Sequence, residues 1–399
     1  MAFPGRAPCS PVHGLDPADV RRWRARRWFL SSPAPDVQTA VAANPPFDFS
    51  RAAYLSLFAR VDRFDPEDLH RMVFDEGALR PAVLWRVGRL LVPFEVLPAL
   101  FAAQEFSWGA RGRRRRLDGH LNEQAERLAG PLAAALKEGP RPEGELVASI
   151  ERARAPGDGA PTAVLDRLVG RGDLEMVRPV RSLAFDQVFY RRPSGPGRLR
   201  PTGLTDYALL SALAGYYFRV CGPATRDDFA LWSGVSLAAA RKTLEDLAGI
   251  LDEVDIEGER QAHFMLEEDA EELRGRAKPS TTRAVFLPSH DPAMTSFASG
   301  FAPMADARTA ARLRLIPRRS REGLGRVNQP VLVGGRVVGS WDWSPKTRRV
   351  EVALVRELGP DAQAAVEGEA KRLDGFLEGE LRRLPTSSAP EPRSASGSR

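Results

Sequence analysis

Two features of this sequence are suited to chemistry: a histidine beside an aspartate, and runs of arginine. His290 and Asp291 stand together in "LPSHDP", where a strand pattern changes to a loop. An imidazole next to a carboxylate can work as an acid–base pair or contact DNA. The alternative is structural, because an aspartate before a proline is typical of a turn. We keep His290 as a candidate DNA contact.

The first arginine run is "RRWRARRWFL", residues 21–30, with five arginines in seven positions. Arginines on a helix face can contact phosphate oxygens, and each contact adds a salt-dependent increment to the affinity. Arg24, Arg26 and Arg27 are the candidates for such contacts. A solvated face is an equal alternative, because the chain has only five lysines among 58 basic residues and a net charge of only +6.

A second run, "RGRRRR" at residues 111–116, lies at an expected boundary between domains. Arg113 and Arg114 are further candidates for phosphate contact. The alternative is again a solvated segment, which is more typical of a charge run at a junction.

The composition predicts neither a metal site nor a cofactor site. Cys9 and Cys221 lie far apart and form no disulfide or metal-binding framework, which suits a reducing compartment. The histidines have no ligand spacing, and the sequence has neither a phosphate-binding loop nor a dinucleotide fingerprint. Without a signal peptide or an apolar run of about 18 residues, we expect a cytoplasmic monomer with no membrane association.

The elements that must position these residues are predicted from helix starts and turn signals. Asp16 and Pro17, and again Asp65 and Pro66, are typical of an N-cap followed by the first helical residue. Residues 204–266 read as helix, a short helix capped near Thr225, a longer helix and two strands. That order is typical of a winged helix.

After residue 282 the pattern changes to strands, with Gly334 and Gly335 forming a hairpin signal between two valine-rich runs. We therefore predict an α+β protein with tandem winged-helix units followed by a C-terminal β-barrel-like domain. The predicted units are winged helices at 15–106, 117–193 and 204–266, a β-barrel-like domain at 282–355, a closing helix at 360–384 and a disordered tail at 385–399.

Six blocks of the sequence occur in the order found in a known family. They are "ADVRRWRARRWFL", "LSLFARVDRFDPEDL", "RLLVPFEVLPAL", "YFRVCGPATRDDFALWSGVSLAAARKTLEDL", "FLPSHDPAM" and "PVLVGGRVVGSW". Over residues 15–355 the chain resembles the winged-helix DNA-binding proteins that include the AlkZ-like, or YcaQ-type, crosslink-repair DNA glycosylases. The resemblance implies a cleft for duplex DNA. It also implies excision of alkylated purines and unhooking of interstrand crosslinks, without a metal or cofactor.

The catalytic motif of that family is Gln-x-Gln, or Gln-x-Asp in a subgroup. Aligned without a gap, it falls on Pro46, Phe47 and Asp48, so the first glutamine is missing and Asp48 matches the aspartate form. Aligned with a gap, it falls on Pro45, Pro46 and Phe47. The histidine often found near "VGRLLVP" is also absent, with Leu90 nearest its place.

Asp48 is therefore the candidate catalytic residue, with Arg51 close by as a candidate phosphate contact. A cationic alkylated purine leaves readily, so one carboxylate that stabilises the sugar or positions a water can suffice. The alternative is that Asp48 caps the helix beginning near Ser50. Two hypotheses remain open: a monofunctional glycosylase, and a DNA-binding or scaffold protein that lost the glutamine. The third unit is expected to be scaffold, because its presumed reading helix has no net charge.

Overall fold

The chain folds three times through the same order of elements: helix, short strand, helix, helix, strand, strand. The computed structural model describes residues 14–84, 88–100, 103, 112–155, 160–177, 188–193, 206–275, 281–298, 304–305, 307–313, 319–320, 323–324, 328–344 and 346–383. In each repeat the three strands form an antiparallel sheet in the order first, third, second.

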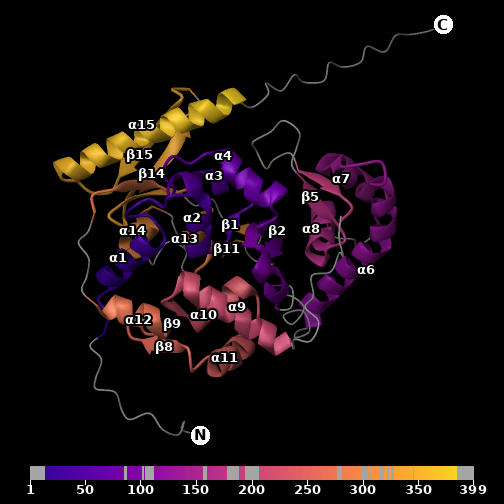
Figure 1. Ribbon diagram of the computed structural model, residues 1–399, viewed down its shortest axis with the longest axis horizontal. Helices are drawn as coiled ribbons and strands as arrows, with labels where there is room; N and C mark the ends of the chain where they lie inside the picture. The colour runs from indigo at the N-terminus through magenta and orange to yellow at the C-terminus, as the bar shows by residue number, and fades with distance from the viewer. Residues whose placement is uncertain are drawn as a thin grey trace.

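The first repeat follows an N-terminal helix and lies at the centre of the molecule (Figure 1). Each of its helix starts has a side-chain cap: Asp36, Ser50 and Asp65 accept hydrogen bonds from backbone amides of the first turns. Its elements are α1 (Pro17–Arg27), which precedes it, then α2 (Val37–Ala43), β1 (Phe47–Asp48), α3 (Arg51–Phe58), α4 (Pro66–His70), a π-helical turn η1 (Arg71–Asp75), β2 (Leu79–Leu84), β3 (Gly88–Pro93) and η2 (Phe94–Val96).

The second and third repeats flank the first, at the right and at the bottom of Figure 1. The second comprises α6 (Gly112–Ala135), β4 (Arg141–Pro142), α7 (Glu143–Arg152), α8 (Pro161–Arg171), β5 (Glu175–Val177) and β6 (Phe189–Arg191). The third comprises α9 (Asp206–Cys221), β7 (Ala224–Thr225), α10 (Arg226–Ser233), α11 (Leu237–Asp246), β8 (Leu251–Val254), β9 (His263–Leu266) and α12 (Glu267–Arg274).

A four-stranded antiparallel sheet completes the molecule, in the order β10-β13-β14-β15. It is curled and, in the described residues, open, with β10 and β15 at its edges. Helix α15 lies along it at the top of Figure 1. The elements are β10 (Ala284–Phe286), α13 (Pro292–Thr295), α14 (Ala307–Arg312), β11 (Arg319–Ser320), β12 (Gly323–Leu324), β13 (Gln329–Val333), β14 (Arg336–Ser344), β15 (Arg349–Leu354) and α15 (Pro360–Arg383).

The first repeat contributes side chains to all three large apolar cores. Leu90 packs in a core shared with the third repeat, and Leu91 in a core shared with the second. Phe58 packs in the core between the four-stranded sheet and α15. A polar contact also joins the first and second repeats, because Arg89 pairs with Asp166 at 2.5 Å and with Glu143 at 2.9 Å. The first repeat is thus held from three sides.

Several local predictions are confirmed. Helix α1 begins after an Asp16 cap with Pro17 in its first turn, and α4 begins the same way at Asp65. Thr225 forms a capping box with Asp228 at the start of α10. Gly334 and Gly335 both have positive φ in the turn between β13 and β14. Residues 385–399, the predicted tail, lie outside the described residues. No helix in the described part of the chain combines the length and apolarity needed to cross a bilayer.

Candidate active site

Asp48 is the last residue of β1, where it pairs with Leu90 of β3. The helix that follows is capped by Ser50, whose Oγ accepts from the Ala52 amide at 3.1 Å. The interpretation of Asp48 as the cap of this helix is therefore wrong. Its carboxylate instead accepts a hydrogen bond from the Ser50 hydroxyl and is half-buried.

The environment of Asp48 favours its protonated form. Burial raises the pKa of this carboxyl above its ordinary value, while the Ser50 hydrogen bond and the imidazole of His290 oppose that rise. His290, 242 residues further along the chain, is thus close enough to act on Asp48 electrostatically. Its own side chain is exposed. The fold brings together two of the residues singled out in the sequence.

A buried ion pair holds the loop that carries His290. Asp291 receives two hydrogen bonds from the Arg60 guanidinium, at 2.7 and 2.8 Å, and both side chains are fully buried. Arg60 also donates to Asn44 Oδ1 and to the Ser56 carbonyl. A bidentate pair with its remaining donors satisfied fixes geometry in a dry interior. The loop before α13 is consequently tied to the end of α3.

Asp291 is not an acid–base partner of His290. Its carboxylate is occupied by Arg60, and it caps α13 by accepting from the Ala293 amide at 2.9 Å. The aspartate is structural, as the alternative had it, but it caps a helix instead of forming a turn. His290 Nδ1 lies 3.2 Å from Ser289 Oγ.

The arginines of α1 are engaged within the protein. Arg24 is 4% exposed, bonds to the Pro223 carbonyl and lies over the Phe297 ring. Burial lowers its pKa to about 10. Arg26 and Arg27 pair with Glu272 at 2.5 Å and Asp269 at 3.0 Å, both on α12. The burial of Arg24 weighs against a phosphate contact, and such contacts by the other two would compete with acidic partners.

Arg51 is exposed at the first position of α3, three residues after Asp48. It is the candidate phosphate contact that lies nearest to Asp48 in the chain. Arg113 and Arg114 lie in α6, but their side chains are outside the described residues. In the third repeat, Arg241 on α11 pairs with Glu245 at 2.9 Å.

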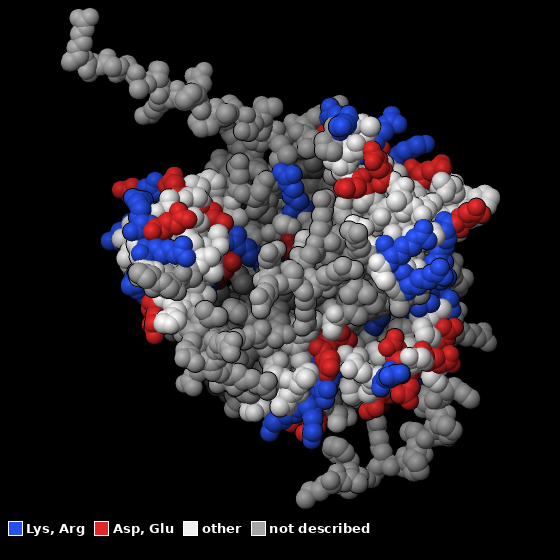
Figure 2. Space-filling view, turned by 180° about the vertical axis from the view of Figure 1, so that it is seen from behind, with Lys and Arg blue, Asp and Glu red and all other residues white. Residues whose placement is uncertain are grey.

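A cluster of basic side chains appears at the right of Figure 2, on the flank where Figure 1 places α1 and α14. Arg308 and Arg312 of α14 and Arg336 at the start of β14 are exposed. These three arginines were not among the candidates from the sequence.

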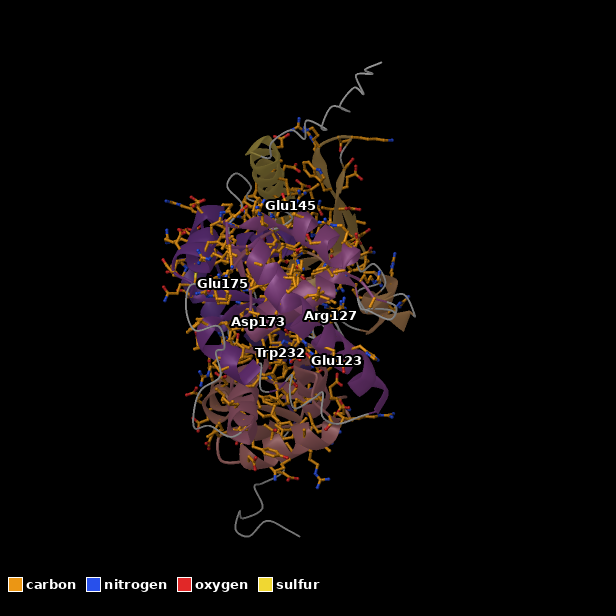
Figure 3. The ribbon with its side chains drawn as sticks, turned by 90° about the vertical axis from the view of Figure 1, so that its right-hand side faces the viewer. Glu123, Arg127, Glu145, Asp173, Glu175 and Trp232 are labelled. Atoms are coloured by element: carbon orange, nitrogen blue, oxygen red, sulfur yellow. The ribbon has the colours of Figure 1, made fainter. Side chains whose placement is uncertain are left out.

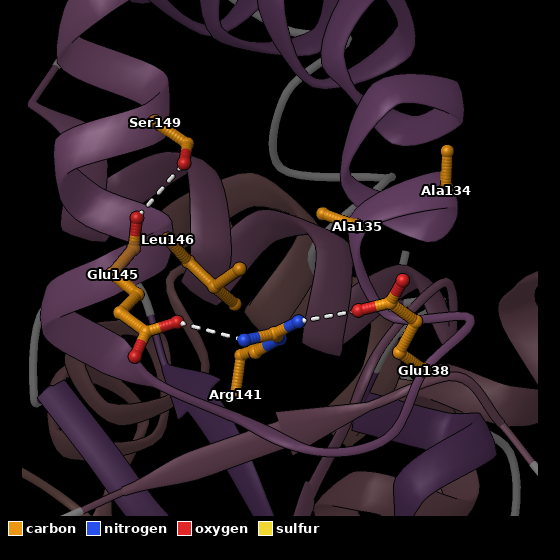
Figure 4. A pocket seen from close by; sticks show the side chains of 7 residues that line it. All are labelled: Ala134, Ala135, Glu138, Arg141, Glu145, Leu146 and Ser149. Atoms are coloured by element: carbon orange, nitrogen blue, oxygen red, sulfur yellow. Dashed lines mark hydrogen bonds and ion pairs between the residues drawn. The ribbon is translucent and has the colours of Figure 1, made fainter.

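The side of the second repeat seen in Figure 3 carries Glu123, Arg127, Glu145, Asp173 and Glu175. A pocket in the same repeat is poorly suited to an anion. This pocket, of about 240 Å³ between α6 and α7, is drawn in Figure 4. Its guanidinium, from Arg141, is held between Glu138 at 2.9 Å and Glu145 at 3.5 Å. Among the described residues, no group of His, Cys, Asp and Glu side chains could hold a metal ion.

Comparison with known proteins identifies the family. The family model described as DNA glycosylase AlkZ-like matches residues 37–376. Among solved structures, the Streptomyces sahachiroi DNA glycosylase AlkZ is similar with a TM-score of 0.70 and 22% sequence identity, over 91% of this chain and 98% of that chain. This similarity shows a shared fold, while a search of curated proteins finds no match. The chain belongs to the AlkZ-like DNA glycosylase family.

Proposed function

We propose that this protein is a monofunctional DNA glycosylase that hydrolyses the N-glycosyl bond of alkylated or crosslinked purines in duplex DNA. The observation that carries the proposal is the position of Asp48. Asp48 is the last residue of β1, its carboxylate is half-buried, and the helix that follows is capped by Ser50 instead. The exposed imidazole of His290, from a distant loop, acts on this carboxylate electrostatically. Family membership supplies the reaction class, hydrolysis of N-glycosyl bonds.

Asp48 would act on the sugar rather than on the base. An N7-alkylated guanine already carries a positive charge, so it departs as a neutral base without protonation. Positive charge then develops at C1′ of the deoxyribose, and a carboxylate in a partly desolvated site stabilises that charge more strongly than in water. The pKa of Asp48, although raised by burial, has to lie below the working pH for this role.

The three repeats are proposed to be winged helices that, together with the curled sheet, form a DNA-binding cleft. Their element order and the first-third-second strand order support this assignment. We keep the boundaries predicted from the sequence for these units. Arg51 is the proposed phosphate contact beside the site, supported by its exposure. Contacts by Arg26, Arg27, Arg113, Arg114 and His290 are part of the same proposal, whereas the burial of Arg24 leaves it a structural role.

A second candidate function is DNA binding without cleavage. In the gapless alignment, the residue that stands in place of the family's first glutamine is Pro46, which is buried and has no polar side-chain group to orient a water. If a second polar group is indispensable for hydrolysis and no other residue supplies it, the protein would bind DNA and leave the base in place.

The deciding experiment measures abasic sites in duplex DNA containing N7-methylguanine, under single-turnover conditions and corrected for spontaneous loss. We expect release by the wild type and a rate lower by about 100-fold or more in Asp48→Asn. Asp65→Asn is a matched control, because Asp65 caps a helix of the same repeat. A wild type that binds this duplex but releases nothing, from it or from a crosslinked duplex, would leave the non-catalytic function.

A further inference from the structure

We propose that His290 is the second catalytic group of this site, the one that accepts a proton from the attacking water while Asp48 stabilises the sugar. The inference rests on the proposed function and deepens it. It gives His290 a role in bond making, beyond the contact with DNA expected from the sequence. It also names the residue that replaces the missing glutamine.

Arg60 connects the two segments of chain that carry Asp48 and His290. Phe47 immediately precedes Asp48, and the Arg60 guanidinium lies over the Phe47 ring at 5.7 Å. Arg60 grips Asp291, which immediately follows His290. Each member of the pair is therefore one residue away from a group that contacts Arg60. Arg60 thus ties the backbone that carries Asp48 to the loop that carries His290.

The placement of the His290 side chain suits a proton acceptor. Its imidazole is exposed, so substrate can reach it, and its Nδ1 lies within hydrogen-bond distance of Ser289 Oγ. That contact leaves Nε2 for a water molecule. His290 acts electrostatically on Asp48 of β1, and the carboxylate of the adjacent Asp291 is paired with Arg60.

The proton and electron balance is complete without any further reactant. Water oxygen forms a bond to C1′ as the bond from C1′ to N9 of the alkylated guanine breaks. The electrons of that bond neutralise the positive charge of the departing base. The water gives one proton to neutral His290, which later passes it to solvent. The products are an abasic sugar and a neutral alkylated base, and Asp48 is unchanged.

The test compares three variants for single-turnover base release and for duplex affinity. His290→Ala should lower the rate by about 100-fold and leave the affinity within about twofold. His290→Gln keeps a hydrogen-bonding side chain but cannot take the proton, so it should be as slow as His290→Ala. His120→Ala is the matched control, an exposed histidine on α6 whose Nδ1 lies 3.6 Å from Glu123.

Two further readouts separate catalysis from folding. Free imidazole should raise the rate of His290→Ala but not that of the wild type, and only the wild type should lose rate on the acid side of the range in which imidazole titrates. Release by wild type and His290→Gln at equal rates would overturn the catalytic role and leave a DNA contact. Absence of release by the wild type would instead overturn the proposed function itself.

Discussion

Asp48 is a residue whose charge costs the folded protein stability. Burial raises its pKa above the value in the unfolded chain, about 3.9. The protonated carboxyl therefore contributes stability that is full below that pH and is lost as pH rises through the folded pKa. We expect Asp48→Asn, which cannot ionise, to have a higher free energy of unfolding than the wild type at pH 7. Thermal unfolding at pH 4 to 8 should show the difference in stability between Asp48→Asn and the wild type becoming smaller as the pH falls.

Asp36 provides a control, because its pKa is shifted in the opposite direction to that of Asp48. Its carboxylate caps α2, and the Thr39 amide that it accepts from holds its pKa below the ordinary value. The stability from this charge is present above the unfolded pKa and is lost as pH falls through the folded pKa. Asp36→Asn should therefore be less stable than the wild type at pH 7. The same direction of change in both variants would contradict this account of Asp48.

Single residues mark the limit of what the sequence could predict. Asp48 and His290 were identified from residue type and from the family resemblance, but nothing in the sequence indicates that residues so far apart meet. Arg24 and Arg60 look alike in the sequence, as arginines in helical segments rich in aromatic residues. Their burial depends on a carbonyl and a carboxylate that arrive from other parts of the fold. These contacts form between residues far apart in the sequence, so the local spacing of residues cannot predict them.

At the scale of elements, the turn between β13 and β14 depends on glycine for two reasons. Gly335 has φ of +78°, and a Cβ there would lie 2.5 Å from the Cβ of Ala25 on α1. The hairpin thus sits directly on the N-terminal helix. Gly258, in the corresponding turn between β8 and β9, has φ of +81° but open space around it. At both positions a side chain would strain the backbone, but only at Gly335 would it also collide with a neighbouring helix.

We expect Gly258→Ala to lower the free energy of unfolding by about 1 kcal/mol, from backbone strain alone. Gly335→Ala should lower it further, by about 1–3 kcal/mol more, because the added methyl overpacks the contact with α1. Urea unfolding of both variants measures the difference. Equal losses would show that the hairpin can move away from α1 at no cost.

Elements were more predictable than single contacts because their signals are local. The Asp-Pro helix starts, the Thr225 cap and the Gly-Gly turn each depend on residues within a few positions, and all four are confirmed. The sheet orders were not foreseen from the sequence. Short strands such as β1 and β4, of two residues each, carry no periodicity of their own. They exist because the third strand of each repeat supplies their partners.

At the scale of the whole molecule, charge placement decides where DNA is expected to lie. Arg26 and Arg27 of α1 are paired with acidic residues of α12. Arg51 is exposed close to Asp48. We expect Arg51→Ala to reduce the slope of log affinity against log salt by about one, measured by titrating labelled duplex at several salt concentrations.

Arg241→Ala is the matched control for this measurement. Arg241 is exposed on α11, a helix that carries no net charge from its Arg, Lys, Glu and Asp residues. Its slope should equal that of the wild type. An unchanged slope in Arg51→Ala, or a change in Arg241→Ala, would move the expected DNA path away from the first repeat.

The ion pair between Arg60 and Asp291 has a consequence for synthesis at the ribosome. The two residues are 231 positions apart, so Arg60 leaves the exit tunnel long before its partner is translated. Domains generally fold as they emerge, yet a nascent first repeat has to keep this guanidinium in water until β10 and its loop arrive. Until then Asp48 has no imidazole beside it. The proposed pair of catalytic residues is therefore assembled late, when nearly three quarters of the polypeptide has been made.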